Sequence, residues 1–259
     1  MPSLSDSAVA SKTVVEFKNV HFSYGPDAKI LSDISFTLKQ NETLVILGGS
    51  GSGKSTILRL LLGLIDADSG AIMVQGQDIT QIPEKQLTEL RKHVGMVFQD
   101  GALFDSLTVG ENVGYFLLEH GMDNRRDRPE VERRVREVLK LVGLEQTIDM
   151  MPDELSGGMR RRVAAARTLI YKPELILYDE PTTGLDPATC DNMCKVINDI
   201  KREAGVTGIM VTHNLEDAWA VGDHFLLLGK GNITWKGSAA ELKAKPKDTL
   251  DKFFRGEKI

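Results

Sequence analysis

Residues 43–55 read Thr-Leu-Val-Ile-Leu-Gly-Gly-Ser-Gly-Ser-Gly-Lys-Ser, and this stretch decides the fold. It begins with an apolar run, which is typical of a parallel strand buried on both faces. Its last eight residues fit the phosphate-loop pattern G-x-x-x-x-G-K-S/T, and a segment with helical periodicity follows them. Glycines allow consecutive backbone amides to curl around phosphate oxygens, which side chains would block. Strand, loop and helix together predict a phosphate-binding turn in an α/β layered sheet.

The side chains of this loop are the first candidate ligands. Lys54 is expected to reach the outer phosphates of a nucleotide, and Ser55 is expected to hold Mg²⁺. The alternative is a glycine-rich turn without a ligand, which the full pattern between a strand and a helix disfavours. The other loop residues expected to contact the nucleotide are Gly48, Gly49, Ser50, Gly51, Ser52, Gly53 and Thr56.

Two further apolar runs, at 174–178 and 208–212, each end at a residue that carries chemistry. The first ends in the acidic pair Asp179-Glu180. An apolar strand that ends in a carboxylate is typical of the magnesium half of phosphate-loop ATPases. Asp179 is therefore expected on the magnesium side, and Glu180 is placed to polarise an attacking water. Taken alone, the pair would suit an ordinary strand-to-loop transition, but the phosphate loop in the same chain favours the catalytic interpretation.

A Leu-Ser-Gly-Gly-Met segment at 155–159 precedes the acidic pair by about 20 residues. At the start of a helix, a serine hydroxyl and exposed amides bind anions. In its order and spacing the segment resembles the signature motif of ABC ATPases, and the resemblance runs from about Val14 to Gly237. It implies an α/β fold of the phosphate-loop NTPase (RecA-like) type. An antiparallel β subdomain and an inserted helical signature subdomain would complete this ABC ATPase fold.

The resemblance also implies roles for individual residues. Tyr24 sits where the family stacks an aromatic ring on adenine, and Gln99 resembles the glutamine that touches magnesium and the attacking water. Asp186, in Gly-Leu-Asp at 184–186, resembles the loop at the dimer seam, and His213 resembles the histidine that contacts the γ-phosphate. The expected catalytic residues are thus Glu180, His213, Gln99 and Lys54, and the expected metal ligands are Ser55, Gln99 and Asp179.

In this family the phosphate loop of one copy faces the signature segment of another. The chain has one of each, so we expect a head-to-tail homodimer with two composite ATP sites. The residues expected to serve the γ-phosphate bound by the partner are Ser156, Gly157 and Gly158.

The remaining patterns predict the domain organisation. Strand-like segments lie at 14–24 and 34–39, and 225–237 is typical of a hairpin. A helical subdomain is expected over about 101–170, where Val131, Val135, Val138 and Leu139 form an apolar stripe. The predicted divisions are a disordered lead at 1–12, an ABC ATPase domain at 13–245 and a short C-terminal tail at 246–259.

Composition excludes several classes of function. The formal net charge of -5 does not favour nucleic acid as a partner, and the arginines at 125–136 alternate with acids, as on a solvated helix face. Cys190 and Cys194 lack the neighbours of a metal site and are expected to be small apolar fillers. No run reaches the roughly 18 to 20 apolar residues that span a bilayer. Any role at a membrane must then be carried out through partners, and the resemblance to ABC ATPases implies a place at the cytoplasmic face of the inner membrane.

Three classes of ABC protein compete: a transporter motor, a soluble ATPase of translation or DNA repair, and a regulator of cell-wall enzymes. The first is favoured, because the chain has neither a second ATPase unit nor long coiled coils. Three segments are similar to ATPases of the Mla type: Gly-Ala-Leu-Phe-Asp-Ser at 101–106, Leu-Ser-Gly-Gly-Met-Arg-Arg-Arg-Val at 155–163, which contains the arginines at 160–162, and Phe-Phe-Arg-Gly at 253–256. That resemblance implies phospholipid transport with a permease, an MCE-type lipid-binding protein and, in that group, a small accessory protein. A small-solute importer or a cell-division complex is the alternative.

Overall fold

The phosphate loop follows β3 (Thr43–Leu47), a strand near the middle of a six-stranded sheet with the order β10-β9-β3-β8-β7-β6. In the computed structural model, which describes residues 12–25, 28–122, 126–245, 250 and 252–253, five of these strands are parallel and β10 is antiparallel to β9. The other bounds are β6 (Val94–Val97), β7 (Leu175–Asp179), β8 (Thr207–Thr212), β9 (His224–Gly229) and β10 (Asn232–Ser238).

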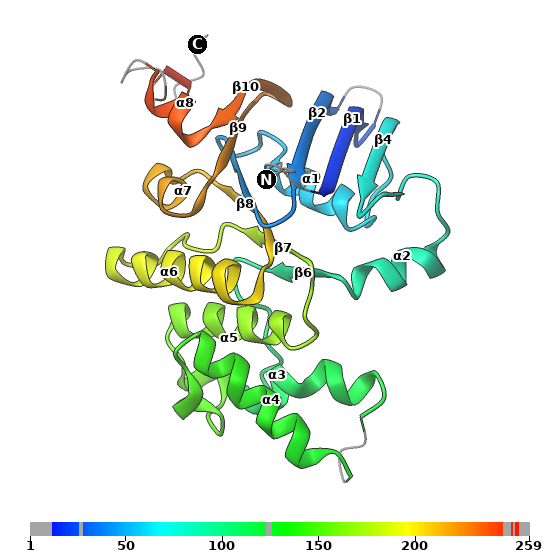
Figure 1. Ribbon diagram of the computed structural model, residues 1–259. Coiled ribbons are helices and arrows are strands. Elements are labelled where there is room, and N and C mark those ends of the chain that lie inside the picture. Colours follow the sequence, from blue (N-terminus) through cyan, green and yellow to red (C-terminus); the bar gives the residue numbers. More distant parts are fainter. Residues whose placement is uncertain (1–11, 26–27, 123–125, 246–249, 251, 254–259) are drawn as a thin grey trace, which may run out of the picture.

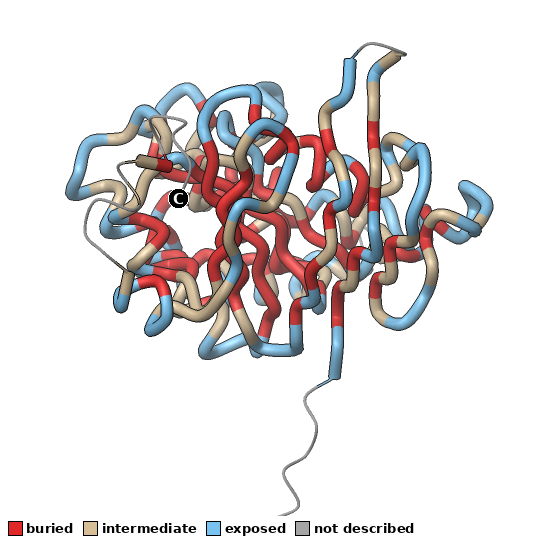
Figure 2. Tube along the Cα trace, turned by 90° about the horizontal axis from the view of Figure 1, so that it is seen from above, coloured by how far each residue is buried: buried red, intermediate tan, exposed pale blue. Residues whose placement is uncertain are grey.

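Every residue of β3 is buried, and its side chains alternate between two hydrophobic cores. Leu44 and Ile46 belong to one core, whereas Val45 and Leu47 belong to the other. Successive side chains of a strand point to opposite faces, so a strand covered on both sides reads as a continuous apolar run. Figure 2 shows these buried segments running through the middle of the molecule. The prediction of a strand buried on both faces is confirmed.

An antiparallel sheet with the order β2-β1-β4-β5 covers one end of the molecule, beside α1 (Figure 1). The two predicted strands are present, and the second is longer than expected because it begins at Lys29. Phe17 and Phe36 stack across them, with ring centroids 4.6 Å apart. The patterns did not predict β4, β5 or α2. The bounds are β1 (Thr13–Ser23), β2 (Lys29–Lys39), α1 (Lys54–Leu61), β4 (Ser69–Val74), β5 (Gln77–Asp78) and α2 (Glu84–Arg91).

The segment predicted to be helical contains no strand among its described residues. Val131, Val135 and Leu139 are buried there, whereas Val138 is only partly buried. On the other face of the same helix, Arg133 pairs with Glu130, as expected of a solvated charged surface. In Figure 1 these helices form the end of the molecule opposite the antiparallel sheet. The bounds are α3 (Val109–Glu119), α4 (Arg128–Leu141), η1 (Glu145–Thr147), η2 (Pro152–Glu154) and α5 (Gly157–Leu169).

The remaining helices are α6 (Pro187–Ala204), α7 (Leu215–Val221) and α8 (Ala239–Lys243). The predicted hairpin is confirmed as β9 and β10, joined by Lys230 and Gly231. Both cysteines are free thiols on α6, and burial raises the pKa of Cys194 to about 12. Within the described ranges no helix is both long and apolar enough to cross a membrane. Of the predicted lead and tail, almost all residues lie outside the described part of the chain.

Candidate functional site

The phosphate loop joins β3 to α1, and its glycines are required by its shape. Gly51 and Gly53 have φ angles of 74° and 104°, a region that L side chains rarely adopt. At Gly48 an added Cβ would lie 2.4 Å from Ser52 Oγ and 2.6 Å from the carbonyl oxygen of Leu228. The backbone conformation thus favours glycine at 51 and 53, and close packing of the loop on itself and on β9 requires it at 48.

Lys54 lies folded over its own loop. Its side chain is only 8% exposed, and Nζ donates hydrogen bonds to the carbonyl oxygens of Gly48, at 2.8 Å, and Gly49, at 3.2 Å. The same ammonium lies 3.3 Å from Oε1 of Glu180. The cation that was expected to reach phosphates is thus paired with the expected catalytic carboxylate.

Glu180 is held by three groups from different segments. Its Oε2 accepts a hydrogen bond of 2.8 Å from Thr183 Oγ1 and lies 2.8 Å from His213 Nδ1, while Oε1 pairs with Lys54. Its φ of 49° lies in the left-handed region, which a non-glycine residue adopts at a cost of about 1 to 3 kcal/mol. The turn thereby directs the carboxylate toward both the phosphate loop and the end of β8.

Asp179, the last residue of β7, accepts a hydrogen bond of 3.1 Å from Ser55 Oγ. Burial raises the pKa of Asp179 above its ordinary value; the bond from Ser55 opposes this rise, and the charge of Glu180 adds to it. A carboxylate and a hydroxyl oxygen side by side suit Mg²⁺, which prefers oxygen ligands and keeps several from water and phosphate. No group of three or more protein metal ligands is found among the described residues, so a cation here would depend on such additional ligands.

A cavity of about 300 Å³ opens above the loop. Tyr24 forms part of its wall; its side chain is 56% exposed, and its hydroxyl accepts a 3.2 Å hydrogen bond from Arg59 Nη1. Phe22 supports the ring from one edge, with centroids 4.8 Å apart. An exposed ring held in this way suits stacking against a planar base. The wall consists of Tyr24, Ile30, Gly51, Ser52, Gly53, Lys54, Ser55, Thr56 and Arg59.

Gln99 follows β6 with an exposed side chain. Within the described part of the chain, no hydrogen bond joins that side chain to the phosphate loop or to the acidic pair. Its backbone oxygen instead accepts a hydrogen bond of 2.5 Å from Arg161 Nε. The structure therefore leaves the predicted contact of Gln99 with magnesium untested.

The signature segment lies at the start of α5. Ser156 caps this helix, with Oγ accepting a 3.3 Å hydrogen bond from the amide of Met159. Gly158 packs against α6 so closely that an added Cβ would lie 2.2 Å from Thr189 Cγ2. Asp186 caps α6 in the same way, and hydrogen bonds from Thr189 hold the pKa of this carboxyl below its usual range. Across the described ranges, no hydrogen bond or ion pair connects Ser156, Gly157 or Gly158 to the phosphate loop.

Four residues that were not predicted as site residues complete the site. Thr183 binds Glu180, and Thr182 Oγ1 donates to the buried carboxylate of Asp217 at 2.5 Å, which joins the loop after β7 to α7. Arg161 reaches the backbone of both Gln99 and Thr183. Thr182 and Arg161 act on segments more than 20 residues away and therefore have no local sequence signal. Thr183 lies three residues after Glu180, but a threonine in a loop is too common to indicate this contact.

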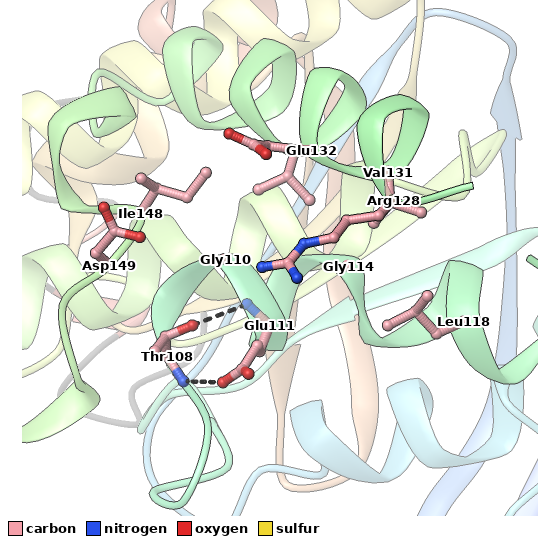
Figure 3. A pocket seen from close by; sticks show the side chains of 11 residues that line it. Thr108, Gly110, Glu111, Gly114, Leu118, Arg128, Val131, Glu132, Ile148 and Asp149 are labelled. Carbon is pink, nitrogen blue, oxygen red and sulfur yellow. Dashed lines mark hydrogen bonds between the residues drawn. The ribbon is translucent and has the colours of Figure 1, made fainter. Parts of the chain in front are cut away.

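A separate cavity of about 370 Å³ lies between α3 and α4. Figure 3 shows Arg128 extending from α4 toward α3, above the reciprocal hydrogen bonds between Thr108 and Glu111 that cap α3. Gly110 and Gly114 line it on the α3 side, next to Ile148 and Val131. None of the predicted site residues lines this cavity.

Comparisons with known proteins agree with this geometry. A sequence profile of the family described as ABC transporter matches residues 31–183. The spermidine/putrescine import ATP-binding protein PotA of Pasteurella multocida is 38% identical over 252 residues, which are 97% of this chain and 65% of PotA. The methionine import ATP-binding protein MetN 1 of Staphylococcus aureus is 36% identical over 244 residues, or 93% of this chain and 70% of MetN 1. The chain thus spans about 65% of the length of the first of these relatives.

Two solved structures show the same arrangement of elements. CbiO1 from Clostridium perfringens, part of the ABC transporter complex CbiONQ, has a TM-score of 0.83 at 29% identity and covers 90% of this chain and 91% of its own. The cassette MJ0796, in a dimeric post-hydrolysis state with ADP and Pi, has a TM-score of 0.77 at 31% identity over 86% of this chain and 98% of its own.

The names of PotA and MetN 1 do not support one expectation. They refer to the import of small solutes, and the predicted likeness to Mla-type lipid ATPases has no support among them. The three short segments behind that prediction cover only a small part of the chain, whereas the profile covers more than half of it. With its matching profile, its sheet topology and its phosphate loop, the chain belongs to the ABC transporter family, in which it forms an ATP-hydrolysing cassette.

Proposed function

We propose that this chain binds ATP with Mg²⁺ and hydrolyses it in a head-to-tail dimer, and that the cycle powers transport through a separate membrane permease. One observation carries this proposal. Lys54, Ser55, Asp179, Glu180 and His213 converge at one end of the parallel sheet. Among the described residues, no hydrogen bond or ion pair joins the signature segment to them. In this proposal a single chain holds most of one hydrolysis site, and its signature segment belongs to the site of another copy.

Each group at the phosphate loop has a role that its position supports. Lys54 would leave Glu180 and neutralise the outer phosphates, which releases the carboxylate to polarise the attacking water. His213, beside Glu180, would contact the γ-phosphate, and Tyr24 would stack on adenine. Ser55, Asp179 and Gln99 would hold Mg²⁺, whose charge offsets that of the β- and γ-phosphates.

The signature segment requires a second copy in this proposal. Ser156, Gly157 and Gly158 present a capped helix start, whose amides and dipole favour an anion. Asp186 lies on the adjacent helix cap, where the dimer seam is proposed. The dimeric structure of MJ0796 with ADP and Pi supports this arrangement for a chain with 31% identity.

The proposed domain limits follow the same division. The cassette would span 13–245, with the helical subdomain at about 101–170, a lead at 1–12 and a tail at 246–259. The cassette would lie on the cytoplasmic face of the membrane, held there by its permease. The formal net charge of -5 for the whole chain offers no support for a nucleic-acid partner.

For the transported molecule, we propose a small solute that a membrane permease imports. This was the alternative at the sequence level, and the names of PotA and MetN 1 favour it. The competing proposal is phospholipid transport with an MCE-type protein and a small accessory protein. It rests on residues 101–106, the arginines at 160–162 and residues 253–256. Of these, residues 254–256 lie outside the described residues.

The test is capture of the assembled complex. The Glu180→Gln variant, trapped with ATP, is purified from detergent-solubilised native membranes, and the proteins and lipids that accompany it are identified. Lys54→Ala is the matched control, because it removes nucleotide binding from the same loop. A multi-span permease is expected in the first sample and depleted in the control.

The companions of the permease then separate the cargo classes. A solute-binding protein would support import of a small solute, and an MCE-type protein with bound phospholipid would support lipid transport instead. A cell-division protein would replace transport by regulation of cell-wall enzymes. Recovery of ribosomes or DNA without any membrane protein would overturn the transport proposal.

A further inference from the structure

Arg161 on α5 is a buried cation that binds two distant loops. Its side chain is 8% exposed, Nε donates to the carbonyl oxygen of Gln99, and Nη2 donates to the carbonyl oxygen of Thr183, both at 2.5 Å. Its Nη1 is buried without a hydrogen-bond partner among the described residues. Burial lowers the pKa of this guanidinium, and the nearby charge of Asp100 only partly offsets that effect.

Burying a cation without a paired carboxylate costs free energy, so the hydrogen bonds that Arg161 makes must have another role. A buried cation normally pairs with a carboxylate, yet none forms an ion pair with Arg161 in the described part of the chain. The planar guanidinium offers several donors in a rigid fork, so one side chain can hold two carbonyl oxygens at a defined separation. An ammonium on a flexible stem holds no such separation. Arg161 thus links two backbone segments, one at Gln99 and one at Thr183, and we call this pair of hydrogen bonds the brace.

One of the two braced segments carries the proposed catalytic carboxylate. The carbonyl of Thr183 accepts from Arg161, while the hydroxyl of Thr183 donates to Oε2 of Glu180 at 2.8 Å. Glu180 is therefore two hydrogen bonds away from α5. Ser156 lies at the start of this same helix, five residues before Arg161.

The other braced segment carries Gln99 and is fastened to α5 at more than one point. Arg167 Nη1 donates to the carbonyl oxygen of Ala102 at 2.7 Å. Gly101, which lies between these two bonded residues, has a φ of 78°. It packs against the backbone of Arg160, and an added Cβ at Gly101 would lie 3.2 Å from the carbonyl oxygen of Arg160. Residues 99–102 therefore have little freedom to move independently of the signature helix.

We propose that Arg161 is a positioning residue that makes the location of Glu180 and Gln99 depend on the location of their own signature helix. The inference rests on the proposed head-to-tail dimer, in which that helix serves the nucleotide of the other copy. Binding at one site would then be transmitted through α5 and Arg161 to the catalytic groups of the second site. Arg161 touches neither nucleotide in this arrangement and acts only through backbone carbonyls.

The first experiment tests the brace without nucleotide. Hydrogen–deuterium exchange is measured on the full chain for peptides covering 98–103 and 180–186, in the wild type, Arg161→Met and Arg161→Lys. The matched control is Arg162→Met on the same helix, since the hydrogen bond that Arg162 makes among the described residues goes to the carbonyl of Val142 within the helical subdomain. Faster exchange is expected in both peptides for Arg161→Met, an intermediate effect for Arg161→Lys, and no change in either for the control. Unchanged exchange in Arg161→Met, or an equal rise in the control, would overturn the brace.

The second experiment tests the coupling. ATP turnover is measured against ATP concentration, with binding of ATP measured separately in the Glu180→Gln background. For Arg161→Met we expect nucleotide binding within about twofold of wild type, a kcat lower by roughly 10- to 100-fold and loss of cooperativity between the sites. A wild-type kcat and Hill coefficient in a folded Arg161→Met protein would refute the coupling.

Hydrogen–deuterium exchange and ATP turnover together distinguish a failure of the proposed function from a failure of the positioning role. If the wild type neither hydrolyses ATP nor dimerises, the proposed function fails, whereas the exchange result still decides whether Arg161 braces the two loops. If the wild type turns over ATP cooperatively and Arg161→Met behaves in the same way, the proposed function stands and the positioning role is wrong. Arg161→Lys guards against misfolding, because it keeps the charge and removes the fork.

Discussion

The phosphate loop at 48–55 and the signature segment at 155–159 are both glycine-rich starts of helices, but their surroundings differ. Lys54 and Ser55 bind carboxylates that arrive from residues 179–180, so the loop gathers its partners from distant parts of one chain. Ser156 instead binds the amide of its own helix. Two glycine-rich helix starts thus differ in the partners that they bind within the chain, and the proposed head-to-tail dimer would supply the missing partner of the second.

The largest effect is expected at the complete region. Glu180→Gln keeps the shape of the side chain but removes the negative charge that faces Lys54 and His213, so turnover should fall by on the order of 10²-fold or more. ATP binding should persist, and the dimer should accumulate with ATP. Phosphate release and light scattering measure the two effects. Near-normal phosphate release from the variant would show that another group polarises the water.

A mixing experiment compares the two regions directly. Lys54→Ala and Ser156→Arg should each inactivate a homodimer, since one variant lacks the phosphate-binding lysine and the other fills the signature segment. In a mixed head-to-tail dimer, one of the two composite sites has neither change. Equal amounts of the two variants should therefore recover at most about a quarter of wild-type turnover, because half of randomly formed dimers are mixed and coupling between the sites can only lower the yield.

The control for that experiment is the double variant mixed with wild type. In that mixture every mixed dimer has one defect in each site, so turnover should come only from wild-type homodimers. Wild-type homodimers make up a quarter of that mixture, so roughly a quarter of wild-type turnover is expected there too. A signature segment that served its own copy would instead give about half of wild-type turnover in the control and none in the first mixture, and either result would contradict the proposal.

The smallest effect is a change in the Tm of the protein when Asp179 is replaced. The folded pKa of Asp179 is raised mainly by burial, so its ionised form destabilises the fold at every pH above that pKa. Asp179→Asn should raise the Tm at neutral pH without nucleotide, by on the order of 1 °C because the side chain is partly exposed to screening solvent. The difference should vanish as the pH falls below the ordinary carboxyl value of 3.8. Calorimetry between pH 3 and 8 measures it.

Adding MgATP should reverse the order of the Tm values of the wild type and Asp179→Asn, because a ligand raises the Tm only of the protein that binds it. The wild type should then have the higher Tm. A variant that gains no stability at neutral pH would show that burial does not penalise the Asp179 carboxylate. An Asp179→Asn protein that MgATP stabilises as well as the wild type would remove Asp179 from the magnesium site.

Local patterns were sufficient for the elements that carry the loop. The apolar run of β3 and the hairpin at 224–238 each have a signal that depends only on neighbouring residues. The edge strand β5 spans just two residues and has no periodicity to detect. Its partner β4 begins with two exposed residues, Ser69 and Gly70, and is defined by its pairing with β1 rather than by its own pattern. The patterns missed both strands for this reason.

The sequence alone determined the chemistry available to this protein: a phosphate loop, an acidic pair after a buried strand and a signature segment in the order of one family. Backbone geometry and burial of apolar runs are local properties, and they can be read from consecutive residues. The tertiary structure alone decided that Lys54 rests on Glu180, that Thr182 binds Asp217 and that Arg161 joins the signature helix to two loops. These contacts depend on how the helical subdomain and the sheet pack together, and several of them end on backbone carbonyls, which every residue possesses and no sequence pattern can distinguish.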